Sequence, residues 1–262
     1  MSPAVGPALD RVVCAGIPIT ACSRKDAAVE TVRQATSDLT EGVDVHLCNA
    51  YTLALADQQP ELASMLRRAS INFPDGKAVV WANRLLHRDR RLPRERVYGP
   101  DLFLDVFELG QDLGLRHYLL GSTDDVLADL ASELGRRFPK ANIVGVESPP
   151  FRALTDAESH EQAARIIGSG AQVVWLGLGT PKQDWAASEL AERIPAVFCS
   201  VGAAFDFVAG HQKQAPRWVQ DAGLEWLFRL ACEPRRLWRR YLFGNARFLW
   251  SLVRTNRRRR VT

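Results

Sequence analysis

The stretch Ile71-Asn-Phe-Pro-Asp-Gly-Lys-Ala-Val-Val-Trp81 holds a strand end, a turn and the start of a helix. The apolar residues before Pro74 indicate a short buried strand, and the run from Lys77 indicates a helix. Pro74 fixes φ before Asp75, and Gly76 permits unusual backbone angles after it, so the turn presents the Asp75 carboxylate. Ligand sites of α/β proteins lie where strands lead into helices. A plainer interpretation stays open, in which Asp75 only caps the following helix.

Short apolar strands alternate with amphipathic helices through most of the chain, which predicts an α/β fold with a largely parallel sheet and flanking helices. Ser23 is the expected N-cap of the first helix, and a hairpin is expected over residues 11–22. Strands are expected over residues 43–48, 71–73, 117–121, 143–146, 173–177 and 196–201. Helices are expected over residues 24–39, 51–69, 77–87, 124–138, 155–167 and 181–193, with another starting at Gly99.

The composition predicts a globular protein of a reducing compartment. The chain has 262 residues, of which 47% are apolar, and its five cysteines are scattered without the spacing of a zinc site or a disulfide framework. No signal-peptide pattern opens the chain, and no apolar run approaches the length of a membrane span. A cytoplasmic location is therefore expected.

The charge is divided unevenly along the chain. Residues 211–262 hold thirteen Lys or Arg and three acids, a balance of +10, which leaves −6 for residues 1–210 because the whole chain carries +4. This asymmetry predicts a core over residues 1–210 and a basic helical appendage over residues 211–262 that meets an anionic partner.

The appendage combines arginines with Trp, Phe and Leu at helical spacing, in helices expected to break near Pro234 and Gly244. Such helices fit the interface of an anionic membrane. The alternative is a helix packed on the core with a solvated basic face. Arginines directed inward would instead bind a diphosphate, and membrane contact and diphosphate binding are compatible if the substrate is a lipid diphosphate.

Unusual residues follow several expected strands, where ligands bind in an open parallel sheet. They are Asn49, Asp75, the turn 121–123, the turn 177–183 and the turn 202–206. Glycine-rich turns before helices leave N–H groups free for phosphate, although none is a GxGxxG or Walker A loop. The chain contains no Asp-x-Asp pair and no histidine pattern typical of a metal site, so neither a metal nor a cofactor is expected.

Together these residues resemble the WecG/TagA/CpsF family, glycosyltransferase family 26. The likeness runs from about residue 11 to 248, in order and at family-like spacing. The matching blocks are Asn49-Ala50, Pro74-Asp75-Gly76, Glu95-Arg96-Val97, Gly99-Pro-Asp-Leu102, Tyr118-Leu-Leu-Gly121, Gly177-Leu-Gly-Thr-Pro-Lys-Gln-Asp-Trp185, Gly202, Phe205-Asp206, Ala209-Gly210, Ala215-Pro216, Gly223-Leu-Glu-Trp-Leu-Phe-Arg-Leu230 and Glu233-Pro-Arg-Arg236.

The resemblance implies a Rossmann-like core and an inverting, metal-independent transfer of a hexose-type sugar from a UDP-sugar to a polyprenyl-diphosphate-linked acceptor. The product would serve cell-surface polysaccharide or teichoic-acid-type biosynthesis. Such enzymes act at the inner face of the cell membrane as peripheral proteins, with an appendage that closes over the site. A homo-oligomer is compatible with the resemblance.

The resemblance also implies residue roles. Asp75 is the expected general base. The expected substrate-binding residues are Asn49, Thr52, Arg96, Asp101, Gly177, Gln183, Gly202, Phe205 and Asp206, and those for the lipid diphosphate are Arg229, Arg236 and Arg239. One departure is Leu47, where some members carry Thr, so a hydroxyl contact is lost or moved to Thr52 and the donor sugar stays open.

Two other classes of protein compete with this interpretation. A nucleic-acid or membrane-binding module without enzymatic activity would use the arginines of the appendage, but no nucleic-acid signature accompanies them. A nicotinamide enzyme would need a GxGxxG after its first strand, which the chain lacks.

Overall fold

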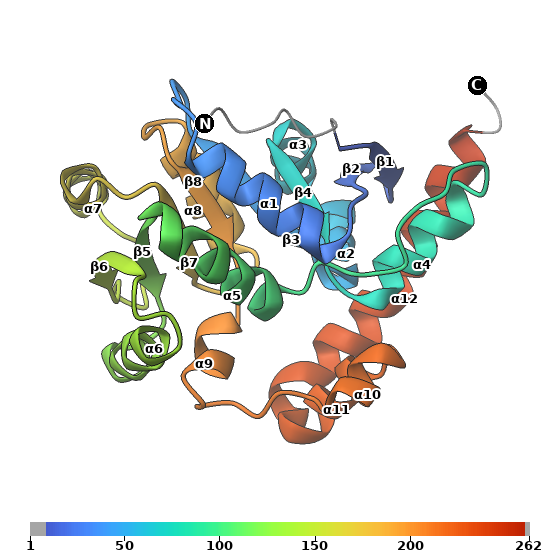
Figure 1. The fold of residues 1–262 in the computed structure, drawn as a ribbon. Coiled ribbons are helices and arrows are strands. Elements are labelled where there is room, and N and C mark those ends of the chain that lie inside the picture. The colour runs from blue at the N-terminus through green and yellow to red at the C-terminus, as the bar shows by residue number, and fades with distance from the viewer. Residues whose placement is uncertain (1–8, 260–262) are drawn as a thin grey trace.

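The computed structural model describes residues 9–259, apart from the side chains of Arg236 and of residues 256–259. Its centre is a six-stranded sheet in the order β4-β3-β8-β7-β5-β6, in which every neighbouring pair is parallel (Figure 1). The strands are β3 (Val43–Cys48), β4 (Ile71–Pro74), β5 (Arg116–Gly121), β6 (Asn142–Glu147), β7 (Val173–Gly177) and β8 (Val197–Ser200). The expected α/β fold with a largely parallel sheet is confirmed.

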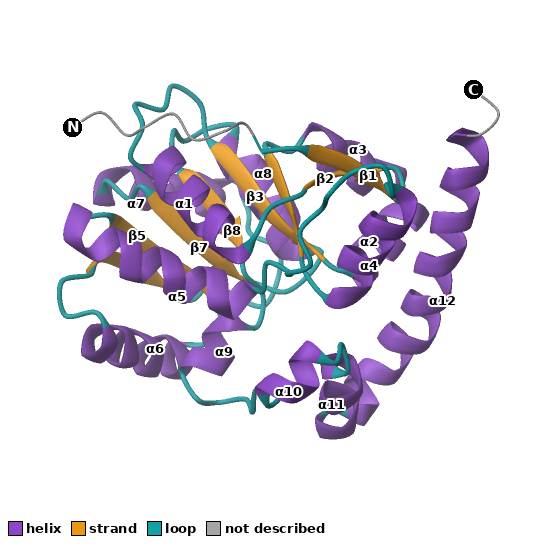
Figure 2. Cartoon of the chain, turned by 45° about the vertical axis from the view of Figure 1, so that its right-hand side comes forward, coloured by secondary structure: helices purple, strands orange, loops and turns teal. Residues whose placement is uncertain are grey.

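Helices cover both faces of this sheet (Figure 2). They are α1 (Arg24–Ala35), α2 (Ala50–Gln58), α3 (Pro60–Arg68), α4 (Lys77–Leu86), α5 (Gly99–Gly110), the 3-10 turn η1 (Gln111–Leu113), α6 (Asp124–Arg137), α7 (Asp156–Ser169), α8 (Lys182–Ala191) and α9 (Ala204–Val208). In β7, Trp175 packs with α1, α5 and α6, and Leu176 packs on the opposite face with α7 and α8. Because both faces are buried, the strand is apolar at successive positions.

The N-terminal hairpin and the first helix cap follow the sequence prediction. Strands β1 (Arg11–Cys14) and β2 (Ile17–Thr20) pair antiparallel as a separate two-stranded sheet. Ser23 caps α1, and its side chain and that of Asp26 form a reciprocal capping box. The hydroxyl accepts from a free backbone N–H of the first turn, which fixes where the helix begins.

The prediction of one helix over residues 51–69 is wrong. The chain forms α2 and α3, separated by Gln59, whose φ of −119° and ψ of 97° are extended. Pro60 begins α3 and has no N–H to continue the bonding ladder of α2. Its ring also disfavours the helical conformation at the residue before it, so the break falls at Gln59.

The appendage consists of α10 (Arg217–Asp221), α11 (Glu225–Cys232) and α12 (Pro234–Arg259), and α12 packs along α2. The predicted break at Pro234 is confirmed, whereas the one at Gly244 is wrong. A Cβ at Gly244 would lie 3.2 Å from Tyr51 Cδ2, so the glycine lets two helices approach rather than ending one. None of the helices in the described part of the chain combines the length and apolar character of a membrane span.

Candidate active site

Asp75 lies in a turn that leaves its side chain free of a capping role. Strand β4 ends at Pro74, and Gly76, with φ of 88°, is the residue before α4. No side chain caps α4, so the plainer interpretation of Asp75 as a helix cap is wrong. The Asp75 N–H donates to Cys48 O at 3.0 Å, which fixes the turn against the end of β3. The backbone of Asp75 is thus fixed, while its carboxylate forms no capping hydrogen bond to α4.

Asn49 joins the end of β3 to this turn. Its Oδ1 accepts from the N–H groups of Tyr51 and Thr52, at 3.0 and 3.1 Å, which caps α2. Its Nδ2 donates to Asp75 Oδ2 at 3.5 Å. The Thr52 side chain is buried, and its hydroxyl lies 3.4 Å from Asn49 Oδ1. One amide therefore orients the carboxylate and begins the neighbouring helix.

The surroundings of Asp75 contain groups that raise its pKa and groups that lower it. Burial raises the pKa of its carboxyl to about 6, and the Glu225 charge acts in the same direction. The charges of Arg96 and Arg229 and the hydrogen bond from Asn49 lower the pKa and oppose that shift. The result is a carboxyl that is ionised at neutral pH and still basic enough to take a proton.

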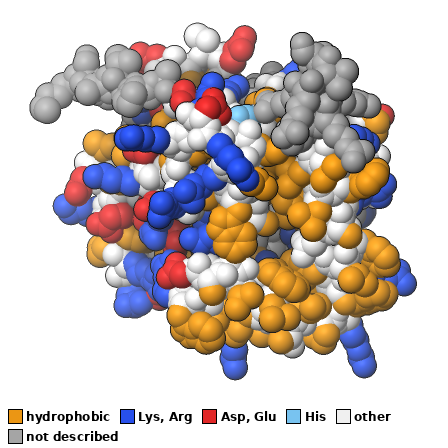
Figure 3. Space-filling view, turned by 90° about the vertical axis from the view of Figure 1, so that its right-hand side faces the viewer, with side chains coloured by type: hydrophobic (Ala, Val, Ile, Leu, Met, Phe, Trp, Pro, Cys, Tyr) orange, Lys and Arg blue, Asp and Glu red, His pale blue; other side chains and the backbone are white. Residues whose placement is uncertain are grey.

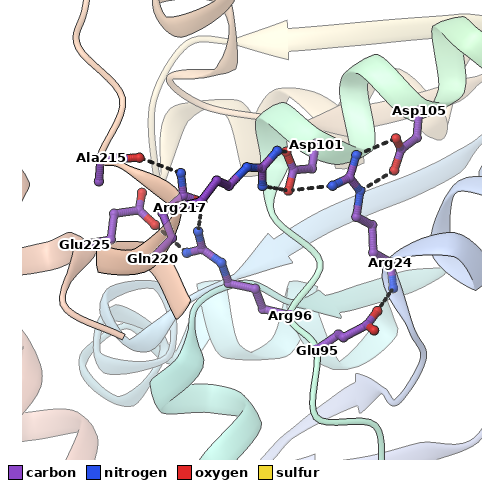
Figure 4. A network of polar contacts seen from close by, with 9 residues as sticks. All are labelled: Arg24, Glu95, Arg96, Asp101, Asp105, Ala215, Arg217, Gln220 and Glu225. Carbon is purple, nitrogen blue, oxygen red and sulfur yellow. Dashed lines mark hydrogen bonds and ion pairs between the residues drawn. The ribbon is translucent and has the colours of Figure 1, made fainter. Parts of the chain in front are cut away.

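Arg96, whose charge acts on Asp75, connects the core to the appendage. Figure 4 shows its contacts with the appendage. Its guanidinium forms an ion pair with Glu225 of α11 and donates to Gln220 Oε1 of α10 at 2.8 Å. It also lies 3.9 Å from the centre of the Tyr98 ring. The Glu225 carboxylate of the appendage therefore partly neutralises the Arg96 charge. The same Arg96 charge lowers the pKa of Asp75 in the core.

Asp101 lies in a second junction of the same kind (Figure 4). It forms ion pairs with Arg24 of α1 at 3.0 Å and with Arg217 of α10 at 2.9 Å. Arg24 also contacts Asp105 at 2.5 Å. Asp101 is buried and has two cationic partners, so its visible role is to fix α10 to α1 and α5. Its expected contact with substrate stays a prediction.

The three arginines expected to hold a diphosphate differ in their placement. Arg229 is largely buried, lies 5.4 Å from the centre of the Phe207 ring, and is 4.0 Å from Glu233. Its charge lowers the pKa of Asp75, so it belongs to the Asp75 group. Arg239 is exposed beside Trp238, with 5.2 Å between guanidinium and ring centre. The side chain of Arg236 lies outside the described part.

The other expected residues gather at the ends of β7 and β8. A Cβ at Gly202 would lie 3.7 Å from the amide of Gln183, and Gln183 Oε1 accepts from Gly179 N–H at 3.0 Å. A Cβ at Gly177 would come 2.6 Å from the Phe205 ring, which is fully buried in the core. Gly177 and Phe205 therefore have a packing reason to be present. Asp206 is half-buried in α9.

Leu47, the departure from the family pattern, has a packing role. It is buried in the core, where a Cβ at Gly99 would lie 3.0 Å from its Cδ1. Leucine at this position therefore packs β3 against the start of α5. Thr52, the expected replacement for a lost hydroxyl, is occupied with Asn49.

The sequence analysis assigned no site role to Glu225, Gln220 or Tyr241, and Tyr241 was expected only among the apolar residues of the appendage helices. Burial raises the pKa of Tyr241, and the charges of Arg229, Glu225 and Asp75 also act on it, which places this α12 side chain in the same group. Glu225 is one of only three acids in residues 211–262. An isolated acid in a basic segment was a usable signal, because it suggests a specific cationic partner.

A comparison with known families gives a match that covers most of the chain. The family model described as Glycosyl transferase WecG/TagA/CpsF family matches residues 12–262, which is nearly the whole chain. The match includes the Asp75 turn and the appendage that supplies Glu225 and Arg229.

Proposed function

Because the chain belongs to the WecG/TagA/CpsF glycosyl transferase family and is therefore a glycosyltransferase of cell-surface polysaccharide biosynthesis, we propose its donor, acceptor and mechanism. The donor is a UDP-sugar, and the acceptor is a glycan linked to a polyprenyl diphosphate. A hexose-type sugar is transferred with inversion and without a metal ion. The observation that supports this is the Asp75 carboxyl, whose pKa is raised to about 6, set between arginines of the core and the appendage.

In this mechanism Asp75 is the general base. The acceptor hydroxyl gives its proton to Asp75 as its oxygen attacks the anomeric carbon of the donor. The bond from that carbon to the phosphate oxygen breaks on the opposite face, which inverts the centre and releases UDP. Arg96 and Arg229 are the cations whose charges act on this carboxylate. Fixed donors of this kind stabilise the charge of a diphosphate.

The remaining expected residues complete this proposal. Asn49 orients Asp75, while Thr52, Gln183, Gly202 and Asp206 belong to the donor side. The proposed ligands of the lipid diphosphate are Arg229, Arg236 and Arg239 of the appendage. Residues 1–210 form the catalytic core, and residues 211–262 form the appendage that contacts the inner face of the cell membrane.

A transfer assay tests the proposal. Wild type is given a panel of UDP-sugars and a polyprenyl-diphosphate-linked acceptor in the presence of EDTA, and one donor should give turnover. Asp75→Asn should keep UDP binding by calorimetry and lose about 100-fold or more in kcat, because general bases contribute on this order. Asp125→Asn, an exposed carboxylate in α6, is the matched control.

Three outcomes would contradict the proposal. Near-normal turnover by Asp75→Asn would remove Asp75 as the base. Loss of activity in EDTA that Mg²⁺ or Mn²⁺ restores would overturn the metal-free mechanism. Absence of turnover with every UDP-sugar, despite UDP binding, would overturn the proposed acceptor.

A further inference from the structure

Helix α4 of the core presents large apolar side chains to solvent. Trp81 and Leu85, four residues apart on one side of the helix, are 53% and 59% exposed. Its opposite side packs Val79, Val80 and Ala82 into the core. The helix is thus held firmly by one face while the other exposes Trp and Leu, and such exposed pairs mark interaction surfaces when they form part of a larger patch.

The appendage continues this surface. A Cβ at Gly223 would come 2.7 Å from Trp81 Cη2, so the turn between α10 and α11 lies directly against the Trp81 ring. Trp218 in α10 is 71% exposed, and Leu224 and Leu227 around the same turn are also exposed. We call Trp81, Leu85, Trp218, Leu224 and Leu227 the α4 patch. On the side of the molecule that carries α4 and α12, hydrophobic side chains gather over a broad area (Figure 3).

Arginines lie beside the patch. Residues 84–94 contain five arginines and one acid, Asp89. Arg84, Arg88, Arg91 and Arg94 are exposed, and none of them has an ion pair with another residue in the described range 9–259. Arg90 is 3.9 Å from Asp10. Figure 3 shows Lys and Arg side chains close to the hydrophobic area. This loop therefore presents unneutralised positive charge.

Apolar side chains flanked by unpaired arginines fit an anionic lipid surface better than a second copy of the chain. A symmetric contact between two copies places the same patch on both sides, so it would bring these arginines together. Lipid headgroups supply the opposite charge, and each arginine near such a surface contributes about 1 kcal/mol. Trp and Leu enter the boundary between headgroups and acyl chains.

We propose that α4 and the arginine loop after it contact the membrane directly, so that the lipid-binding surface includes the core as well as the appendage. This inference rests on the proposed function only for its membrane-linked acceptor. Helix α4 begins two residues after Asp75. The same helix therefore sets the distance of the Asp75 turn from the lipid surface, where the acceptor diphosphate lies.

Vesicle co-sedimentation of the full chain tests this inference with no need for activity. The probes are vesicles of phosphatidylcholine with and without phosphatidylglycerol. Leu85→Gln/Arg88→Gln/Arg91→Gln should bind the anionic vesicles at least about tenfold more weakly than wild type, given the contribution of each arginine. Leu113→Gln/Arg67→Gln, which removes an exposed leucine and an exposed arginine from η1 and α3, should bind like wild type.

Three readouts make the result decisive. The unfolding temperature verifies that the triple variant is folded, and if it is not, Arg88→Gln/Arg91→Gln alone should show weaker binding and a smaller salt dependence. Turnover with a short-chain, water-soluble acceptor should stay at the wild-type level, while turnover with the vesicle-embedded acceptor falls. If the proposed function is wrong, wild type should show no turnover with either the water-soluble or the vesicle-embedded acceptor. The inference would be overturned if the folded variant bound vesicles as wild type does. It would also be overturned if the substitutions changed the oligomeric mass of the protein and left its affinity for lipid unchanged.

Discussion

The pKa of the Asp75 carboxyl depends on groups from three parts of the chain. They are Arg96 in the loop before α5, Glu225 and Arg229 in α11, and Asn49 after β3. The Asp75 charge in turn raises the pKa of Tyr241 in α12. Burial raises the pKa of Asp75 to about 6, and Glu225 adds to that rise. Glu225 also forms an ion pair with Arg96, so one residue of the appendage controls the charge balance at the base.

We predict that Glu225→Gln shifts the acidic limb of the pH profile to lower pH. The wild-type kcat/KM should rise with an apparent pKa near 6, because the base acts when ionised. Without the Glu225 charge, and with Arg96 left unneutralised, the carboxylate form of Asp75 is favoured, so relative activity at pH 5 should increase a few-fold. The measurement is kcat/KM from pH 4.5 to 8.

The control for this prediction is Glu95→Gln, an exposed acid next to Arg96 in sequence, whose carboxylate accepts from Arg24 N–H. Its pH profile should overlay that of wild type. A profile of Glu225→Gln with unchanged midpoint and only a lower plateau would show that Glu225 serves folding and not the base.

For single residues, the sequence predicted the Asp75 turn but did not predict which charged residues lie around it. Proline and glycine on either side of one acid are local signals, and the structure confirms the turn that they predict. The pair of Arg96 and Glu225 joins residues 129 positions apart, and no local pattern encodes such a distance. Leu47 shows the same limit, because only its packing against Gly99 explains it.

Between elements, the least expected feature is a buried charged cluster that links β3 to α8. His46 is fully buried, and its ring nitrogens lie 3.1 Å from Asp184 Oδ1 and 3.0 Å from Asp44 Oδ2. Burial lowers the pKa of His46, but the hydrogen bonds to the two carboxylates outweigh it and raise the pKa to about 9. The imidazolium therefore supplies one positive charge between two carboxylates inside the fold.

We predict that His46→Gln destabilises the protein by about 3 kcal/mol or more, because removing one partner leaves buried carboxylates without their cation. The pKa of His46 is higher in the folded state than its ordinary 6.5. Its stabilisation is therefore complete below pH 6.5 and is lost as the pH rises through about 9. Urea unfolding between pH 6 and 10 measures both effects.

In this experiment the wild-type free energy of unfolding should fall from pH 6.5 to 9, and that fall should be smaller in His46→Gln. His87→Gln is the control, since its imidazole is half-buried and contacts a backbone oxygen, Val13 O, at 3.0 Å. An equal pH dependence in wild type and His46→Gln would contradict a protonated His46.

Helices and strands were predicted correctly where a single sequence signal acted. The predictions were wrong where two signals in the same segment competed. Alternating strands and helices gave the sheet and its flanking helices. Pro60 lies inside an apolar helical pattern, and its backbone effect outweighs that pattern. Gly244 was interpreted as a helix end because glycine often ends helices. In the structure this glycine allows the close contact of α12 with Tyr51 of α2, which only the packing of the two helices reveals.

Across the whole molecule, the appendage is joined to the core at several separate places. Arg96 pairs with Glu225, Asp101 with Arg217, and the largely buried Asp57 of α2 with Arg247 and Arg254 of α12. Phe248 of α12 is buried in one cluster with Leu53 and Val79 of the core. The boundary at residue 211 stays a prediction from the charge asymmetry, which did not indicate that the helices of the appendage complete the packing of α2.

We therefore predict that removing residues 211–262 lowers both activity and stability. The truncated chain loses Arg229 and the partner of Arg96, so kcat/KM with a water-soluble acceptor should fall by about 100-fold or more, the order expected when a charge-stabilising donor is removed. Its unfolding temperature should also fall, because the loss of Phe248 and of the partners of Asp57 exposes apolar surface and leaves an acid unpaired. Arg229→Gln in the full chain separates the two effects, since it should reduce turnover while the unfolding temperature changes little. Wild-type kcat/KM in the truncated chain would show that the Asp75 site is complete within residues 1–210, and that the charges of α11 serve only to attach the appendage.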